Sequence, residues 1–163
     1  MIRLILMRHA NALDGSVDRT RPLSREGRSR AQRVAIELKR LGWTPDRIIH
    51  SDATRCVQTV AAMIPIFGDA AAVDSKSVLY LAAPETIDTV IATADRMFGD
   101  SKMTSLMIVA HNPGLSVAAS HWSGQYQSLR PAGSVRLTID ADLFAAATPQ
   151  KVVQFDSLDA GSL

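Results

Sequence analysis

Short apolar runs alternate with helical patterns along this chain of 163 residues, and this alternation is the strongest constraint on its fold. We expect strands at residues 2–7, 47–50, 78–81, 106–110, 135–139 and 152–155. Apolar residues at helical spacing follow each of the first four runs. Repeated strand–helix units predict a three-layer α/β/α domain with a central, mostly parallel sheet. No helical pattern separates the last two runs, which predicts a departure from parallel pairing near the C-terminus and hence a mixed sheet.

Local signals predict where the helices begin and end. Ser24 is a typical N-cap of the first helix, and Gly42 is a typical C-terminal stop. Pro65 predicts the end of the second helix, whose buried face is expected to carry Val57, Val60, Ala61 and Ile64. Pro84 fits the first turn of the third helix, and the apolar stripe of that helix extends to Phe98.

Size and composition predict one soluble domain over residues 1–163. Apolar residues make up 47% of the chain and charged residues 21%, which is ordinary for a globular protein. No apolar run approaches the roughly 18 residues of a membrane span, so we expect no membrane partner. Cys56 is the single cysteine, which excludes an internal disulfide and a site built on several thiolates. These features predict a cytoplasmic protein.

Basic residues are concentrated in one segment of the chain. Residues 19–40 carry seven Arg and one Lys against Glu26 and Glu37, which leaves a net charge of +6. This segment could attract an acidic or phosphorylated partner, or it could be a solvated helix face. Nucleic acid is not expected as a partner, because only 5% of the residues are aromatic and none are interleaved with the basic ones.

Cationic and imidazole side chains follow three of the predicted strands. Arg8 and His9 come after the first strand, Arg55 follows the second, and His111 follows the strand at residues 106–110. The carboxyl ends of strands in an open α/β sheet line the ligand crevice, so we expect these residues to meet. Together they would form an anion pocket, with phosphate as the obvious anion and an imidazole nitrogen as a nucleophile. Arg55 lies in the first turn of a helix, where the dipole disfavours a cation, so a ligand or Asp52 should compensate its charge.

Three motifs in this order resemble those of the histidine phosphatase superfamily, which has the phosphoglycerate-mutase-like fold. They are Arg8-His9, Ser51-x-x-x-Arg55-x-x-Gln58-Thr59 and Val109-Ala110-His111-Asn112-Pro113. The short chain and the segment Asp18-x-x-Arg21-Pro22-Leu23-Ser24-x-x-Gly27 resemble the small SixA-type phosphohistidine phosphatases of that superfamily. The resemblance covers roughly residues 2–120.

The resemblance implies a role for each residue of the pocket. His9 would be the nucleophile that becomes phosphorylated, and Arg8, Arg55 and His111 would complete the phosphate pocket. Arg21 and Asn112 are expected as further substrate-binding residues. The resemblance implies no metal and no cofactor. Because guanidinium groups disfavour a nearby imidazolium, they should keep His9 neutral and able to attack.

The chain departs from the pattern of the superfamily at two places. Ala10 replaces the glycine of the usual Arg-His-Gly motif, which a negative φ at this position would tolerate. The glutamate that many relatives use as general acid has no clear counterpart, and the candidate acids are Glu85 and Asp18. A phosphoramidate needs less help from an acid than a phosphoester does. We therefore expect phosphohistidine in a protein as the substrate, with a small phosphorylated metabolite or a non-catalytic module that binds phosphohistidine proteins as alternatives.

Overall fold

Six strands form a mixed sheet in the order β3-β2-β4-β1-β5-β6. The computed structural model describes residues 1–68, 71–97 and 103–163. Neighbouring strands from β3 to β1 are parallel, whereas β5 is antiparallel to β1 and β6 is antiparallel to β5. The predicted parallel sheet with a C-terminal departure is therefore confirmed. The strands are β1 (Ile2–Arg8), β2 (Arg47–Ser51), β3 (Ala72–Lys76), β4 (Ser105–Ala110), β5 (Ser134–Ile139) and β6 (Val152–Leu158).

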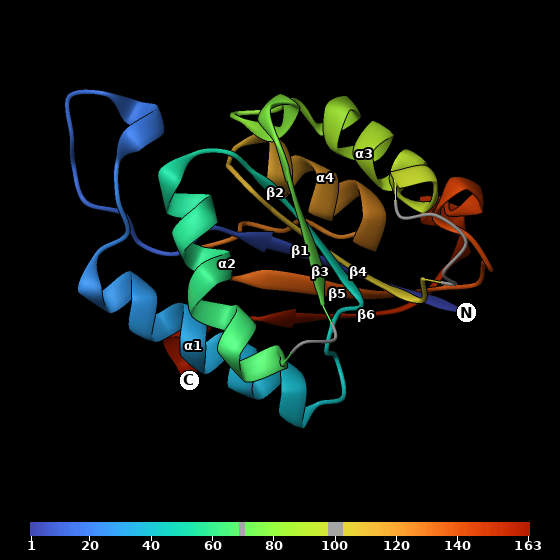
Figure 1. Cartoon of the computed structure of the whole chain (residues 1–163). Helices are drawn as coiled ribbons and strands as arrows, with labels where there is room; N and C mark the ends of the chain where they lie inside the picture. The colour runs from blue at the N-terminus through green and yellow to red at the C-terminus, as the bar shows by residue number, and fades with distance from the viewer. Residues whose placement is uncertain (69–70, 98–102) are drawn as a thin grey trace.

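Helices cover both faces of this sheet and complete the three layers (Figure 1). Two of them, α1 (Arg25–Arg40) and α2 (Thr54–Phe67), share one apolar cluster with Ile5 and Met107 of the central strands. The other two, α3 (Pro84–Met97) and α4 (Gly114–Ser123), share a second apolar cluster. None of the helices in the described part of the chain is both long and apolar enough to cross a membrane.

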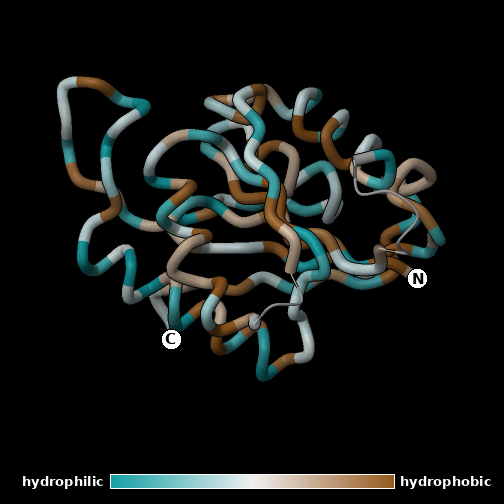
Figure 2. The backbone as a smooth tube through the Cα atoms, in the orientation of Figure 1, coloured by the Kyte–Doolittle hydropathy of each residue, from teal (hydrophilic) through white to brown (hydrophobic). Residues whose placement is uncertain are grey.

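The ends of α1 lie where the sequence predicts them. The Ser24 side chain accepts a hydrogen bond from Gly27 N at 2.9 Å, as an N-cap should. Gly42 follows the helix with φ of +75°, a conformation that favours glycine. Leu38 and its neighbours at helical spacing are buried, while the hydrophilic residues between them, teal in Figure 2, face outward.

The end and the buried face of α2 differ from the prediction. The helix continues through Pro65 to Phe67, because Gly68 N still donates to Ile64 O beyond the proline. Its buried face carries Cys56 and Met63, while Val57 is 42% exposed. Every position of this helix from Val60 to Phe67 is apolar, so periodicity alone could not identify the face that packs on the sheet.

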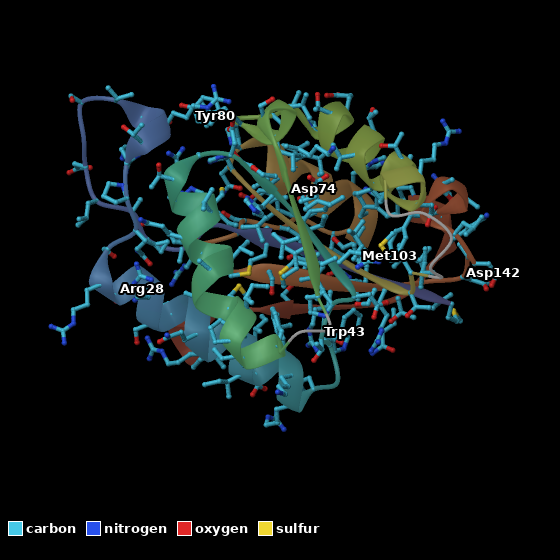
Figure 3. All side chains as sticks on the ribbon, in the orientation of Figure 1. Arg28, Trp43, Asp74, Tyr80, Met103 and Asp142 are labelled. Carbon is cyan, nitrogen blue, oxygen red and sulfur yellow. The ribbon has the colours of Figure 1, made fainter. Side chains whose placement is uncertain are left out.

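The third strand was predicted at the wrong place. Residues 78–81 are not a strand, and the third strand is β3, whose Asp74 is labelled in Figure 3. Because β3 lies at the edge of the sheet and, within the part of the chain that the structure describes, pairs only with β2, its sequence needs no continuous apolar run. A 3₁₀ turn, η2 (Ser77–Leu79), follows it and buries Leu79. The predicted end of the third helical stripe, Phe98, lies outside the described residues.

Candidate active site

The carboxyl ends of three neighbouring parallel strands bring the predicted site together. Arg8 at the end of β1 pairs with Ala110 at the end of β4, and His50 of β2 pairs with Val109. The chain segments after these strands therefore meet at one edge of the sheet. They border a cavity of about 340 Å³ lined by Arg8, His9, Asn11, Ala12, Asp18, Arg21, Arg55, Leu81, His111, Asn112 and Pro131.

The guanidinium group of Arg55 lies between the two histidines of the site. Its Nε donates to His9 Nε2 at 3.2 Å, and its Nη2 lies 3.1 Å from His111 Nδ1. The two imidazole rings are 5.2 Å apart. Arg55 is only 3% exposed, because the first turn of α2 directs it under the strand ends. A single buried cation thus contacts both imidazoles.

His9 is held in one tautomer and kept neutral. Its Nδ1 lies 2.8 Å from Ala10 O and therefore carries the proton, which leaves the lone pair on Nε2. Burial, together with the charges of Arg55, Arg8 and Arg21, lowers the pKa of His9 to about 4, against the opposite effect of the Ala10 hydrogen bond. At neutral pH the ring therefore has an unprotonated nitrogen that can act as a nucleophile.

His111 has the opposite tautomer. Its Nε2 lies 2.7 Å from Ser51 Oγ and 3.6 Å from Cys56 Sγ, while its Nδ1 accepts from Arg55. Burial, together with His9 and Arg55, lowers the pKa of His111 to about 3. Burial also raises the pKa of the Cys56 thiol to about 12, so this cysteine is a packing residue beside the site.

Arg8 has donor capacity that the protein does not use. Its Nη1 donates to Leu129 O at 3.2 Å, but its buried Nε has no hydrogen-bond partner among the described residues. An unpaired buried donor is costly, so a ligand that accepts from it would be favoured. The described residues hold no group of three or more His, Cys, Asp or Glu placed to bind a metal ion. The charges available for an anion are those of the arginines.

Asp18 compensates the charge of Arg55, and the expectation of Asp52 was wrong. Asp18 Oδ2 lies 3.1 Å from Arg55 Nη2, and Asp18 O accepts from Arg55 Nη1 at 2.7 Å. Asp52 instead pairs with Arg19 at 2.9 Å. Hydrogen bonds from Tyr80, Arg21 and Arg55 hold the pKa of Asp18 well below its usual range. In the free protein Asp18 is a carboxylate and has no proton to donate.

The remaining candidate residues lie at different places. Glu85 is exposed in the first turn of α3 and is not among the residues that line the cavity. Arg21 lines the cavity, where its Nε donates to Leu13 O at 2.9 Å and its Nη1 to Asp18. Thus Arg21 is at the site and Glu85 is outside its lining.

Asn112 also lines the cavity, but its amide bonds to the protein. Its Nδ2 donates to Leu129 O at 2.9 Å, and its Oδ1 accepts from Ser116 Oγ at 2.7 Å. Since Leu129 O also accepts from Arg8, Asn112 fixes a partner of Arg8. Tyr80, a partner of Asp18, was not predicted as a site residue, because Tyr80 lies in residues 78–81, which were wrongly predicted to be a strand.

Comparison with known proteins gives a consistent result. Residues 4–76 match the model of the histidine phosphatase superfamily, branch 1. A chloroplastic protein of Arabidopsis thaliana, described as uncharacterized, is 34% identical over 152 residues, which are 83% of this chain. The chain spans 65% of the length of that relative.

Two solved structures resemble nearly the whole chain. A candidate phosphohistidine phosphatase SixA from Nakamurella multipartitia has a TM-score of 0.76 at 21% identity, covering 95% of each chain. A candidate phosphohistidine phosphatase SixA from Agrobacterium tumefaciens has a TM-score of 0.75 at 25% identity, covering 95% of this chain and 97% of its own.

Proposed function

Because the chain belongs to the histidine phosphatase superfamily, we propose that it is a phosphatase that works through a phosphohistidine intermediate on His9. Its phosphoglycerate-mutase-like fold is shared over 95% of the chain with both solved relatives. The observation that carries the proposal is the Nε2 lone pair of His9, which lies 3.2 Å from Arg55 Nε at the cavity lined by arginines.

In the first step, His9 Nε2 attacks phosphorus, and the bond from phosphorus to the leaving group breaks. The proton of His9 stays on Nδ1, where it is donated to Ala10 O in a hydrogen bond, so the phosphorylated ring is cationic. Arg8 and Arg55 would stabilise the phosphoryl oxygens, and such fixed charges account for much of the rate of phosphoryl transfer. Arg55 donates to His9 in the free protein, so the substrate must take over that donor.

In the second step, water attacks phosphorus and the N–P bond breaks. Inorganic phosphate leaves with the atoms of the water, and the electron pair of the broken bond returns to Nε2. His9 is again neutral with its proton on Nδ1. Metal is not needed in this scheme, because the guanidinium groups supply the positive charge. We expect a chelator to leave the activity unchanged.

We propose phosphohistidine in a partner protein as the substrate. Among the described residues, Asp18 is the one carboxyl group that lines the cavity, and Tyr80, Arg21 and Arg55 keep it ionised. A phosphoester substrate would have to release its alkoxide unprotonated, because such a site supplies no proton to the leaving group. A phosphohistidine protonated on its other ring nitrogen leaves as neutral imidazole, which requires no acid from the enzyme.

The direct test is kcat/KM on a phosphohistidine-bearing carrier domain and on a panel of metabolite phosphates. Wild type and Glu85→Gln are compared, and we expect the carrier domain to be preferred by both. If a metabolite is preferred by a wide margin and Glu85→Gln abolishes its turnover, the protein is a small-molecule phosphatase with Glu85 as acid. Tight binding of the carrier domain without turnover would indicate a binding module.

We propose that residues 1–163 act as one catalytic domain in a reducing compartment such as the cytoplasm. Cys56 is a free, buried thiol, so the structure depends on no disulfide of its own. Expression of residues 1–163 alone, followed by the assay above, tests the first part. A fluorescent fusion in cells tests the second.

A further inference from the structure

The carboxylate of Asp18 is fixed by donors from three different parts of the chain. Tyr80 Oη donates to Oδ2 at 2.5 Å, Arg21 Nη1 to Oδ1 at 3.2 Å and Arg55 Nη2 to Oδ2 at 3.1 Å. Tyr80, labelled in Figure 3, is itself covered by the Arg19 guanidinium at 4.3 Å from its ring centroid. The carboxylate is therefore held on the wall of the cavity.

The charges that line the cavity match one phosphate group. Three guanidinium groups, those of Arg8, Arg21 and Arg55, face one carboxylate, which leaves a net charge of +2. Both histidines of the lining are neutral at pH 7, since their pKa values are lowered to about 4 and about 3. A phosphate dianion would neutralise this set of charges.

No cation of the described lining remains free for a second anionic group. Arg21 and Arg55 already bind Asp18, and the donors of Arg8 that the protein leaves unused are taken by the phosphate itself. The uncharged residues of the lining are Asn11, Ala12, Leu81, Asn112 and Pro131. A substrate with a carboxylate or second phosphate beside its phosphate would meet Asp18 without a compensating cation.

We infer that Asp18 is a specificity-determining residue, which disfavours substrates whose leaving group carries a negative charge next to the phosphate. This inference rests on the proposed function for the cavity as a phosphate site. The favoured substrates are then phosphorylated groups with a neutral or cationic leaving group, the class to which phosphohistidine belongs. Like charges a few ångströms apart in a partly exposed site repel enough to change affinity about fivefold or more.

The test uses ligands that cannot be turned over, so that it is independent of catalysis. Dissociation constants of phenylphosphonate, which has no second charge, and phosphonoacetate, which has a carboxylate, are measured by calorimetry at low salt. Wild type should bind phenylphosphonate more tightly, and Asp18→Asn should reduce the ratio of the two constants about fivefold or more. The amide of Asn can still accept from Tyr80, so the variant removes the charge and keeps that hydrogen bond.

Asp52→Asn is the matched control. It removes the same charge from a residue that pairs with Arg19 and does not line the cavity. The ratio of the two dissociation constants in this variant should therefore equal that of wild type. An unchanged ratio in Asp18→Asn, an equal change in both variants, or failure of wild type to bind either phosphonate would overturn the inference. Discrimination between the phosphonates in a protein without phosphatase activity would support the inference and contradict the proposed function.

Discussion

Arg55 donates to His9 Nε2 at 3.2 Å and contacts His111 Nδ1 at 3.1 Å, so one guanidinium group joins both imidazoles of the site. Each ring can accept from Arg55 only while it is neutral. Burial and the same cation that would stabilise a phosphoryl group therefore together keep the nucleophile unprotonated. The position of Arg55 and the protonation state of His9 are two parts of one arrangement.

Arg55→Lys should lower kcat/KM on an aryl phosphate by about 10² or more. A lysine ammonium has one nitrogen and cannot reach both imidazoles and Asp18 in the planar arrangement of a guanidinium. Steady-state kinetics measure the effect, and circular dichroism checks that the variant is folded. Activity within about twofold of wild type would show that the bridging geometry is unimportant.

The two histidines should make the folded state less stable in acid. Their folded pKa values of about 4 and about 3 lie below the ordinary value of about 6.5. The unfolded chain therefore binds more protons as the pH falls from about 6.5 toward 4, and stability falls with it. Each histidine contributes at most about 1.4 kcal/mol per pH unit. Urea unfolding at pH 7 and pH 5 measures this, and His111→Asn should show a weaker pH dependence than wild type.

Gly27→Ala should impair both stability and activity. A Cβ at this position would lie 2.1 Å from Asn11 O, which is far too close, so the backbone beside His9 would have to shift. We expect a loss of about 1–3 kcal/mol in the free energy of unfolding, together with a lower kcat/KM. Gly42→Ala is the control: its φ is +75° with open space around it, so it should lose stability without losing activity.

Asn112→Ala should act through Arg8. The side chain of Asn112 bonds to Leu129 and Ser116, and Leu129 O also accepts from Arg8. Ser116→Ala removes part of the same support without touching the cavity, so both variants should lower kcat/KM. A loss confined to Asn112→Ala would instead identify Asn112 as a direct ligand of the substrate. Kinetics on one aryl phosphate distinguish the two results.

The sheet and the main site residues could be predicted because their signals are local. β4 is apolar from Leu106 to Ala110 and is followed by His111, and β1 ends in Arg8, so the parallel topology alone brings them together. The edge strand β3 could not be predicted, since its side chains alternate between half-buried and exposed and its sequence is largely polar. Its misplacement also concealed Tyr80.

Contacts between segments distant in the sequence were beyond prediction. From the sequence, a ligand or Asp52 was expected to compensate Arg55, whereas the fold supplies Asp18 because the loop after β1 lies over the first turn of α2. The same holds for Gly27, whose need for glycine arises from the approach of the Asn11 backbone to α1. Such choices depend on tertiary packing rather than on local propensity.

The most direct test of the account is the fate of the phosphoryl group on the enzyme. Rapid-quench incubation with a phosphohistidine-bearing carrier domain labelled with radioactive phosphate should transfer the label to His9. The label should be acid-labile and base-stable, should appear and decay at rates consistent with turnover, and should be absent in His9→Ala. Turnover by His9→Ala, or a label that maps to another residue, would contradict the account.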